Sequence, residues 1–469
     1  MINNKRVYLV NPPADIIVLR DMYSSTISKG LYNWPPADLL VTSGILKDKF
    51  DIILKDANTE GLTHDETICE IEKFNPDFVF STFGNSVRDN DYSFLKKVKD
   101  NIPNVKIIGS GGILLHNGLK ELEAHNYIDA TCLNFASKDT TAYINKDYNN
   151  LRNYICRIEG KIIKFEKRTL ENDFSYDTPL HQMLPLKKYN LSHGRYKPVT
   201  SVLTSFGCPG RCTFCISEKI PYKYRNVDNV IEELEFVKNL GVKEIFFRDP
   251  AFGSNPKKTK ELLDKMIKRD FKFSWVADSR IDTLNEDMIN KMSGSGCHAL
   301  HLGVESANEK ILEEYNKRMT LDEVRKVFKL CKKYKIRTVG YFILGLPGET
   351  KDDVLKTIDF AIELDSDYAS FNFPIPIIGT TLRNVSEEKG WINPDSNLVY
   401  DGSLFNVIET EKLSRKEILK LGSYAKKKYY IRPGYIFKRL FGISSFKEFN
   451  TMMKEALILV KGIFNKTSA

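Results

Sequence analysis

The chain has 469 residues, of which 42% are hydrophobic and 28% are charged. This length predicts two or three domains, and the composition excludes disordered, collagen-like and disulfide-stapled proteins. No apolar run approaches the ~20 residues that a membrane span requires. The first apolar run ends at Asn11-Pro12-Pro13 and predicts a strand rather than a signal peptide. Eight cysteines, three of them within eight residues, favour reduced thiols and a metal site, so a cytoplasmic location is expected.

The positive charge is concentrated at the end of the chain. Residues 411–469 hold 14 lysines and arginines against 4 acidic residues, a net charge of +10, whereas the whole chain carries +9. A basic tail rich in aromatic residues is typical of contact with anionic lipid, nucleic acid or an anionic substrate. The alternative is an amphipathic cap whose cationic side chains face water. We expect peripheral contact with a membrane surface or this solvated cap, and no nucleic acid partner.

Residues 1–145 alternate short β-branched runs with amphipathic stretches. Such alternation predicts an α/β fold with a Rossmann-like doubly wound parallel sheet. The expected strands are Arg6–Val10, Asp51–Lys55, Phe78–Thr82, Lys106–Gly109 and Ile128–Leu133. The expected helices are Ala37–Phe50, Glu66–Phe74, Tyr92–Asn101 and Gly118–Ala124.

Ligands of such sheets bind at the carboxyl ends of the strands. Three loops follow these ends in the sequence, and they contain Asn11 and Pro12, Ser81 and Thr82, and Gly111 and Gly112. Small residues in the last two loops allow close approach of the backbone to a ligand. The same residue types also form ordinary turns.

The rest of the chain divides into three parts. Residues 146–195 predict a connector that includes a hairpin-like piece at 154–166. Residues 196–385 contain six strand–helix repeats, which a partial (β/α)6 TIM-type barrel requires. Residues 386–469 predict a helical, basic C-terminal region.

A cysteine array follows the first strand of the second alternating region. Cys208, Cys212 and Cys215 form a Cys-x3-Cys-x2-Cys pattern. Three thiolates on one loop suit three irons of a cubane cluster, and no fourth cysteine lies nearby, which leaves one iron open to an external ligand. The alternative, structural zinc, requires four tetrahedral ligands. The nearest histidine in sequence, His193, lacks the spacing typical of a zinc finger.

With Phe214 just before the last cysteine, the array resembles the signature of the radical S-adenosylmethionine (SAM) superfamily. The resemblance covers roughly residues 198–380 and implies a [4Fe-4S] cluster on the three cysteines. It also implies that SAM chelates the fourth iron and is cleaved to methionine and a 5′-deoxyadenosyl radical. The implied SAM-binding residues are Phe214, Asp249, Arg280, Glu305 and Gly345. Glu349 falls one position later than in the commonest version of its motif.

An α/β sheet before such a barrel resembles the cobalamin-binding subclass, which includes anaerobic tetrapyrrole cyclases, hopanoid-modifying enzymes and C-methyltransferases. The implied cobalamin-binding residues are Asn11, Pro12, Ser81, Thr82, Gly111 and Gly112. The Asp-x-His-x-x-Gly signature of other cobalamin proteins is absent, and the spacing of His116 does not match it. The alternative is a sheet that binds another ligand or only packs on the barrel.

These resemblances predict an enzyme that forms a 5′-deoxyadenosyl radical and uses cobalamin for methyl transfer to an unactivated carbon, or for its cyclisation or rearrangement. We expect a small-molecule or lipid-like substrate and an external low-potential electron donor. A tRNA methylthiotransferase is an alternative, but it would require three further clustered cysteines, and Cys69, Cys132 and Cys156 do not fit that pattern. A non-catalytic binding module would not need the strand-end residues.

Overall fold

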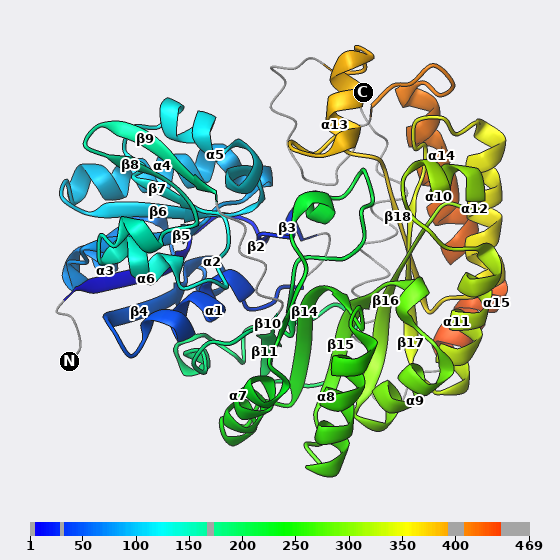
Figure 1. The fold of residues 1–469 in the computed structure, drawn as a ribbon. Helices are drawn as coiled ribbons and strands as arrows, with labels where there is room; N and C mark the ends of the chain where they lie inside the picture. Colours follow the sequence, from blue (N-terminus) through cyan, green and yellow to red (C-terminus); the bar gives the residue numbers. More distant parts are fainter. Residues whose placement is uncertain (1–4, 29–31, 167–172, 393–407, 442–469) are drawn as a thin grey trace.

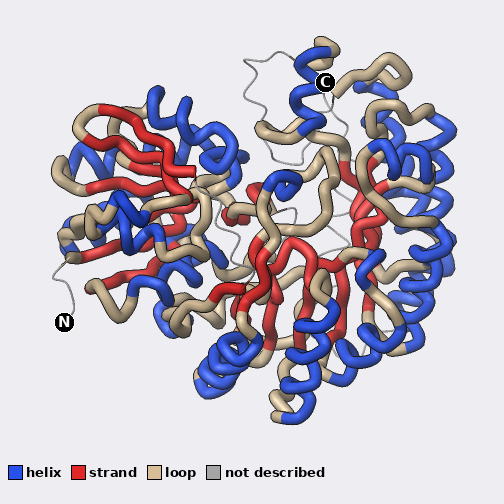
Figure 2. Tube along the Cα trace, in the orientation of Figure 1, coloured by secondary structure: helices blue, strands red, loops and turns tan. Residues whose placement is uncertain are grey.

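The computed structural model describes residues 5–28, 32–166, 173–392 and 408–441. The chain forms two α/β bodies, the first on the left of Figure 1 and the second on the right. Each body has a sheet of mostly or entirely parallel strands with helices packed against it, so the α/β fold class is confirmed. In the second body the strands form the inner layer and the helices the outer layer (Figure 2).

The first body is built on a seven-stranded sheet with the order β4-β1-β5-β6-β7-β8-β9. Its five parallel strands follow the order 2-1-3-4-5 along the chain, so the topology switches between β1 and β5. The strands are β1 (Arg6–Asn11), β4 (Asp51–Asp56), β5 (Phe78–Thr82), β6 (Lys106–Ser110), β7 (Ala130–Cys132), β8 (Asn153–Ile158) and β9 (Lys161–Glu166). The helices are α1 (Ala37–Leu46), α2 (Ala57–Glu60), α3 (His64–Phe74), α4 (Arg88–Asn101), α5 (Gly112–Ala124) and α6 (Asp139–Ile144).

Strand β1 shows why this sheet is covered on both faces. Val7 and Leu9 belong to one hydrophobic core, and Tyr8 and Val10 belong to another. Side chains alternate across a strand, so two cores require helices on both sides of the sheet. This arrangement confirms the doubly wound sheet.

Two hairpins differ from the sequence prediction. Strands β8 and β9, which we assigned to the connector, pair antiparallel with each other and extend the first sheet beyond β7. The first sheet therefore continues to Glu166, past the expected boundary at residue 145. A second, unpredicted hairpin, β2 (Val18–Asp21) and β3 (Ser24–Ile27), follows β1. Its Arg20 and Asp21 are almost fully buried, which no local hydrophobic pattern indicates.

The second body is a six-stranded parallel sheet with the order β11-β14-β15-β16-β17-β18. This open sheet confirms the partial barrel. Its strands are β11 (Val199–Val202), β14 (Glu244–Phe252), β15 (Ser274–Ser279), β16 (Cys297–Glu305), β17 (Arg337–Ile343) and β18 (Tyr368–Asn372). Its helices are α7 (Val227–Asn239), α8 (Pro256–Lys268), α9 (Glu286–Gly294), α10 (Glu309–Glu314), α11 (Leu321–Lys333) and α12 (Lys351–Leu364).

The described part of the C-terminal region is helical, with α13 (Thr381–Glu388), α14 (Arg415–Tyr430) and α15 (Pro433–Phe441). The buried Tyr429 of α14 donates a hydrogen bond to the backbone of Ser366 just before β18. This contact holds α14 against the barrel. Within the described residues, none of the helices has the length and apolar character needed to cross a membrane.

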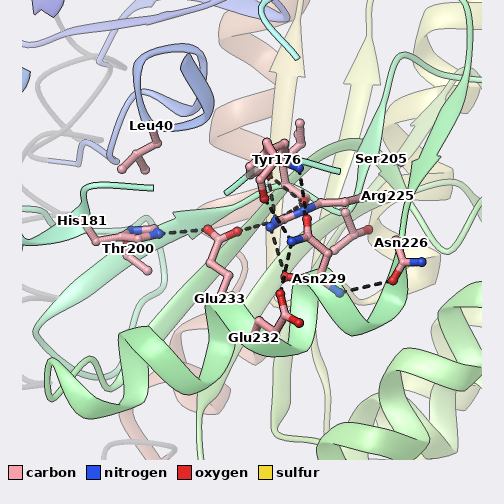
Figure 3. A network of polar contacts seen from close by, with 12 residues as sticks. Leu40, Tyr176, His181, Thr200, Ser205, Arg225, Asn226, Asn229, Glu232 and Glu233 are labelled. Carbon is pink, nitrogen blue, oxygen red and sulfur yellow. Dashed lines mark hydrogen bonds and ion pairs between the residues drawn. The ribbon is translucent and has the colours of Figure 1, made fainter. Parts of the chain in front are cut away.

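A buried polar network joins the connector to the barrel (Figure 3). His181 Nε2 lies 2.9 Å from Glu233 on α7, and Glu233 also pairs with Arg225. The Arg225 guanidinium stacks on Tyr176 of the connector, 3.7 Å from the ring centroid. Every charge in the network has a partner, which is the condition for burying charges at low cost.

Candidate functional site

The three cysteines lie on one loop at the carboxyl end of β11. A small sheet of β10 (Asp173–Phe174), β13 (Lys223–Arg225) and β12 (Ser205–Phe206) holds both ends of this loop. Gly207 opens the loop with φ at +73°, and a Cβ there would collide with the Pro221 carbonyl. Glycine is therefore required at this turn.

The loop directs backbone N–H groups at the thiols. Gly210 N–H donates to Cys208 Sγ at 3.3 Å, and Ser217 N–H donates to Cys215 Sγ at 3.4 Å. Burial nevertheless raises the pKa of Cys215 to about 12. A bound metal deprotonates such thiols, and N–H donors to sulfur then stabilise the thiolates.

Two cations accompany the thiols. Arg280, just after β15, places Nη1 3.6 Å from Cys212 Sγ, and its other nitrogens pair with Asp282. A Cβ on Gly210 would collide with this guanidinium. The buried Lys317 ammonium adds a second positive charge, 3.0 Å from Glu305. Sequence reasoning missed Lys317 because it lies beyond the strand end.

The donor set fits an iron–sulfur cluster. Among the residues that the structure describes, no three His, Cys, Asp or Glu side chains are arranged so that they could hold a single metal ion. The thiolates of a cubane cluster bind separate irons and need not converge on one point. Three thiols with N–H donors and nearby cations suit an anionic cluster with one open iron.

Asp249 is predicted to bind SAM. In the structure, the hydrogen bonds of its side chain go to Thr204 and Ser205, just before the cysteine loop. Its carboxylate accepts hydrogen bonds from the backbone N–H and hydroxyl groups of both Thr204 and Ser205. Burial raises its pKa to about 6 despite these four bonds. The structure therefore shows Asp249 anchoring the cysteine loop to β14, and a direct contact with SAM stays a prediction.

Glu305 ends β16 in the left-handed region, with φ at +67°. This conformation is uncommon for residues other than glycine, and such strained residues are enriched at functional sites. A Cβ on Gly303 would collide with the Glu305 carboxylate and lie 2.7 Å from Lys317 Nζ. Glu305 and Lys317 thus form a buried pair at the barrel mouth, where the predicted SAM contact would lie.

Glu349 holds the glycine-rich turn after β17. Its carboxylate accepts hydrogen bonds from the N–H groups of Gly345 and Leu346, at 2.9 and 3.0 Å, and from the Ser306 hydroxyl at 2.6 Å. Burial raises its pKa to about 7. Glu349, one position later than in the commonest version of the motif, therefore stabilises the turn at Gly345 and Leu346. Phe214 packs nearby against Tyr315, with ring centroids 6.1 Å apart.

The model of the radical SAM superfamily matches residues 202–361. This part of the chain is a radical SAM domain. The match spans the cysteine loop and the strand ends that carry Asp249, Arg280, Glu305 and Gly345. The superfamily expectation from the sequence is confirmed, and the domain implies a [4Fe-4S] cluster and SAM.

Relatives extend the likeness beyond the radical SAM domain. An uncharacterised methyltransferase of Pyrococcus horikoshii is 28% identical over 93% of this chain and 95% of its own length. The anaerobic magnesium-protoporphyrin IX monomethyl ester cyclase of Rubrivivax gelatinosus is 25% identical over 86% of this chain and 75% of its own. The fold resembles OxsB, a cobalamin-dependent radical SAM enzyme, with a TM-score of 0.70 and 15% identity over 97% of this chain and 71% of that one.

The six residues predicted to bind cobalamin lie at the carboxyl ends of β1 and β5 and just after β6. We call this side of the first sheet, where the parallel strands end, its ligand edge. Asn11 and Thr82 flank the topological switch point, where open α/β sheets bind ligands. Gly111 has φ at +147°, and its Cβ would lie 2.6 Å from the Phe83 carbonyl. The structure therefore brings these residues together, but a role in cobalamin binding stays a prediction.

Hairpin β2–β3 covers part of this edge. Arg20 donates to Asn11 Oδ1 at 3.1 Å and to the Pro12 carbonyl at 2.9 Å, and it pairs with the buried Asp91 at 2.7 Å. Asn85 Oδ1, beside Gly112, is buried and has no hydrogen-bond partner among the described residues. Such an acceptor suits an amide N–H of a ligand, and cobalamin carries several amide side chains.

The hairpin also connects the two bodies. Asp21 accepts two hydrogen bonds from Arg248 of β14, at 2.8 and 3.0 Å. Tyr23 accepts one from Gly207 N–H at 3.1 Å, and His116 Nε2 lies 3.2 Å from the Ile216 carbonyl. The ligand edge of the first sheet therefore faces the cysteine loop.

Asp38 makes stability depend on pH at this interface. Burial first, and then the charge of Asp21, raise its pKa to about 8. The folded chain therefore keeps a proton that the unfolded chain releases near pH 4, so stability falls by about 1.4 kcal/mol per pH unit as pH rises toward 8. Asp38→Asn should flatten this dependence in melting curves recorded from pH 5.5 to 8.5. An unchanged pH dependence in the variant would contradict this assignment.

Proposed function

We propose that this protein is a cobalamin-using radical SAM enzyme that methylates, cyclises or rearranges an unactivated carbon of a small-molecule substrate. The observation that carries the proposal is the three-thiol loop at the mouth of the open barrel, facing the switch point of a 2-1-3-4-5 sheet. When bound, a [4Fe-4S] cluster would supply the electron that cleaves SAM reductively. An external donor must deliver that electron.

The chain's own residues hold and orient the reactants. Cys208, Cys212 and Cys215 would hold the cluster, and Arg280 and Lys317 place positive charge beside the thiolates. Glu305 offers a carboxylate at the barrel mouth to the ribose hydroxyls of SAM.

In this proposal cobalamin binds at the edge formed by Asn11, Ser81, Thr82 and Gly111–Gly112. Support comes from the switch point, from the unpartnered Asn85 acceptor and from the proximity of this edge to the cysteine loop. When bound there, cobalamin would supply a methyl group or an electron to the substrate. Arg20 holds the edge in the conformation described here.

The methylthiotransferase alternative finds less support in the structure. Cys69 is exposed on α3, whereas Cys132 and Cys156 are buried in β7 and β8. Burial raises the pKa of each of these two thiols to about 12. The three cysteines therefore do not form a second array like the one at Cys208.

SAM cleavage tests the enzymatic part of the proposal. The protein is reconstituted anaerobically with iron and sulfide, reduced with dithionite and incubated with SAM. We expect 5′-deoxyadenosine and methionine in amounts that grow with protein concentration. Formation of neither product above a blank without protein, despite an intact cluster, would contradict the proposal.

We further propose that the α14–α15 corner contacts an anionic membrane surface, which would suit a lipid-like substrate. Ile431 and Ile436 are each 43% exposed there, in a segment whose charge is strongly positive. Exposed apolar side chains flanked by lysine and arginine are typical of helices that lie on anionic lipid.

Vesicle sedimentation tests this surface. We expect binding to phosphatidylglycerol vesicles that weakens at high salt, and little binding to phosphatidylcholine. Replacing both Ile431 and Ile436 with serine should weaken vesicle binding about tenfold, because the variant has less apolar surface to bury in the membrane. The matched control replaces Leu119 and Ile163, exposed apolar residues of the first body. Equal loss in both variants would contradict the assignment.

A further inference from the structure

His301 lies midway along β16 and faces the inside of the barrel. Its ring centroid is 6.2 Å from that of Phe246 on β14 and 5.8 Å from that of Tyr341 on β17. These strands lie on opposite sides of β16 in the sheet order, so the three side chains meet in the barrel interior. His301 is only 7% exposed.

The environment fixes which nitrogen of His301 carries the proton. Nδ1 lies 2.9 Å from Asp278 Oδ1. Arg248 Nη1 donates to the other oxygen of Asp278 at 3.2 Å, so both oxygens of this side chain are engaged. A carboxylate only accepts, so Nδ1–H donates to it, and in the neutral form of the imidazole this leaves Nε2 as an acceptor.

His301 Nε2 is buried and has no hydrogen-bond partner among the residues that the structure describes. The same holds for Nδ1 of His193, whose ring centroid lies 6.2 Å from that of His301. More than nine in ten buried polar groups are satisfied, and an unsatisfied one costs about 1–3 kcal/mol. The ring is held from behind by Asp278, Arg248 and Asp21, so it cannot easily turn toward another partner.

We propose that His301 Nε2 accepts a hydrogen bond from a hydroxyl or N–H group of the substrate, whose apolar part lies against Phe246 and Tyr341. This inference rests on the proposed function, because it places the substrate in the barrel of the radical SAM domain. Nearby charges favour a donor over an anion. Two carboxylates, Asp21 and Asp278, face one guanidinium here, and Glu305 and Lys317 neutralise each other.

Histidine-selective ¹⁵N NMR on the reconstituted protein with SAM tests the site with three probes of similar size. Benzyl alcohol offers a hydroxyl donor, benzyl methyl ether lacks it, and benzoate is an anion. We expect benzyl alcohol to move the His301 Nε2 resonance saturably, and to bind about three- to tenfold more tightly than the other two. The His301→Phe variant assigns the resonance and should lose this preference. His298, on the same strand with Nε2 bonded to Glu244, is the internal control and should not respond.

Equal affinity for alcohol and ether, an unmoved Nε2 resonance, or an unchanged preference in His301→Phe would each overturn the inference, and the atom would then be satisfied by water. SAM cleavage by the wild-type protein needs none of the three probes. If the wild-type protein did not cleave SAM but still bound benzyl alcohol selectively, the proposed function would be contradicted and the hydrogen-bonding site at His301 would be retained. The reverse result would contradict only the His301 site.

Discussion

Replacing Cys212 with alanine is expected to abolish SAM cleavage and to remove the iron–sulfur absorbance of the reconstituted protein. Loss of a residue that only supports a metal ligand costs about 10–100-fold in affinity or activity, so loss of a ligand should cost more. Cys212 is also the cysteine that Arg280 contacts, at 3.6 Å from its sulfur. Iron and sulfide content, the visible spectrum and 5′-deoxyadenosine yield measure the effect.

Cys69→Ser provides the matched control, because Cys69 is an exposed cysteine on a helix of the first body. It should keep wild-type iron content and product yield. Melting temperature is recorded for both variants, so that unfolding is separated from cluster loss. A Cys212→Ala protein that retains the cluster and cleaves SAM at the wild-type rate would contradict the cluster assignment.

The second large effect concerns stability. Arg225→Met should lower the free energy of unfolding by about 3–5 kcal/mol, because Glu233 is then left buried without its guanidinium partner. Both side chains of this pair are almost fully buried (Figure 3). The variant also loses the stacking of Arg225 on Tyr176 and its bond to Asn229 at 2.7 Å. Urea unfolding monitored by circular dichroism measures the change.

Arg269→Met is the control for this prediction. Arg269 pairs with Glu235 at 2.9 Å, but both side chains are largely exposed. Exposed pairs contribute about 0–1 kcal/mol, so this variant should stay within that range. If Arg225→Met were as stable as Arg269→Met, the network would not be what holds the connector to the barrel.

Local sequence patterns predicted the elements that local physics determines. Strand β5 and helix α12 occupy the predicted residues, because an apolar run between turns and an amphipathic repeat after Thr350 each identify their element without tertiary information. The cysteine array was equally visible, since its chemistry depends on spacing within eight residues.

The buried charged residues and the place of the connector hairpin in the first sheet were not predicted, because they depend on contacts between residues far apart in the sequence. Arg20 and Asp21 look like surface residues, but each pairs with a charged residue far along the chain, Asp91 and Arg248 respectively. Lys317 and Glu349 likewise gain their roles from Glu305 and from the turn at Gly345. The pairing of the connector hairpin with β7 is likewise a long-range contact that the local pattern at 154–166 does not indicate.

Cobalamin retention tests most directly whether one chain unites the two cofactors. The protein is reconstituted anaerobically with iron, sulfide and hydroxocobalamin and then desalted, and cobalamin and iron are quantified per chain. We predict close to one cobalamin and four irons from the cluster per chain. An intact cluster with no retained cobalamin would contradict the two-cofactor enzyme and leave the ligand edge of the first sheet to another molecule.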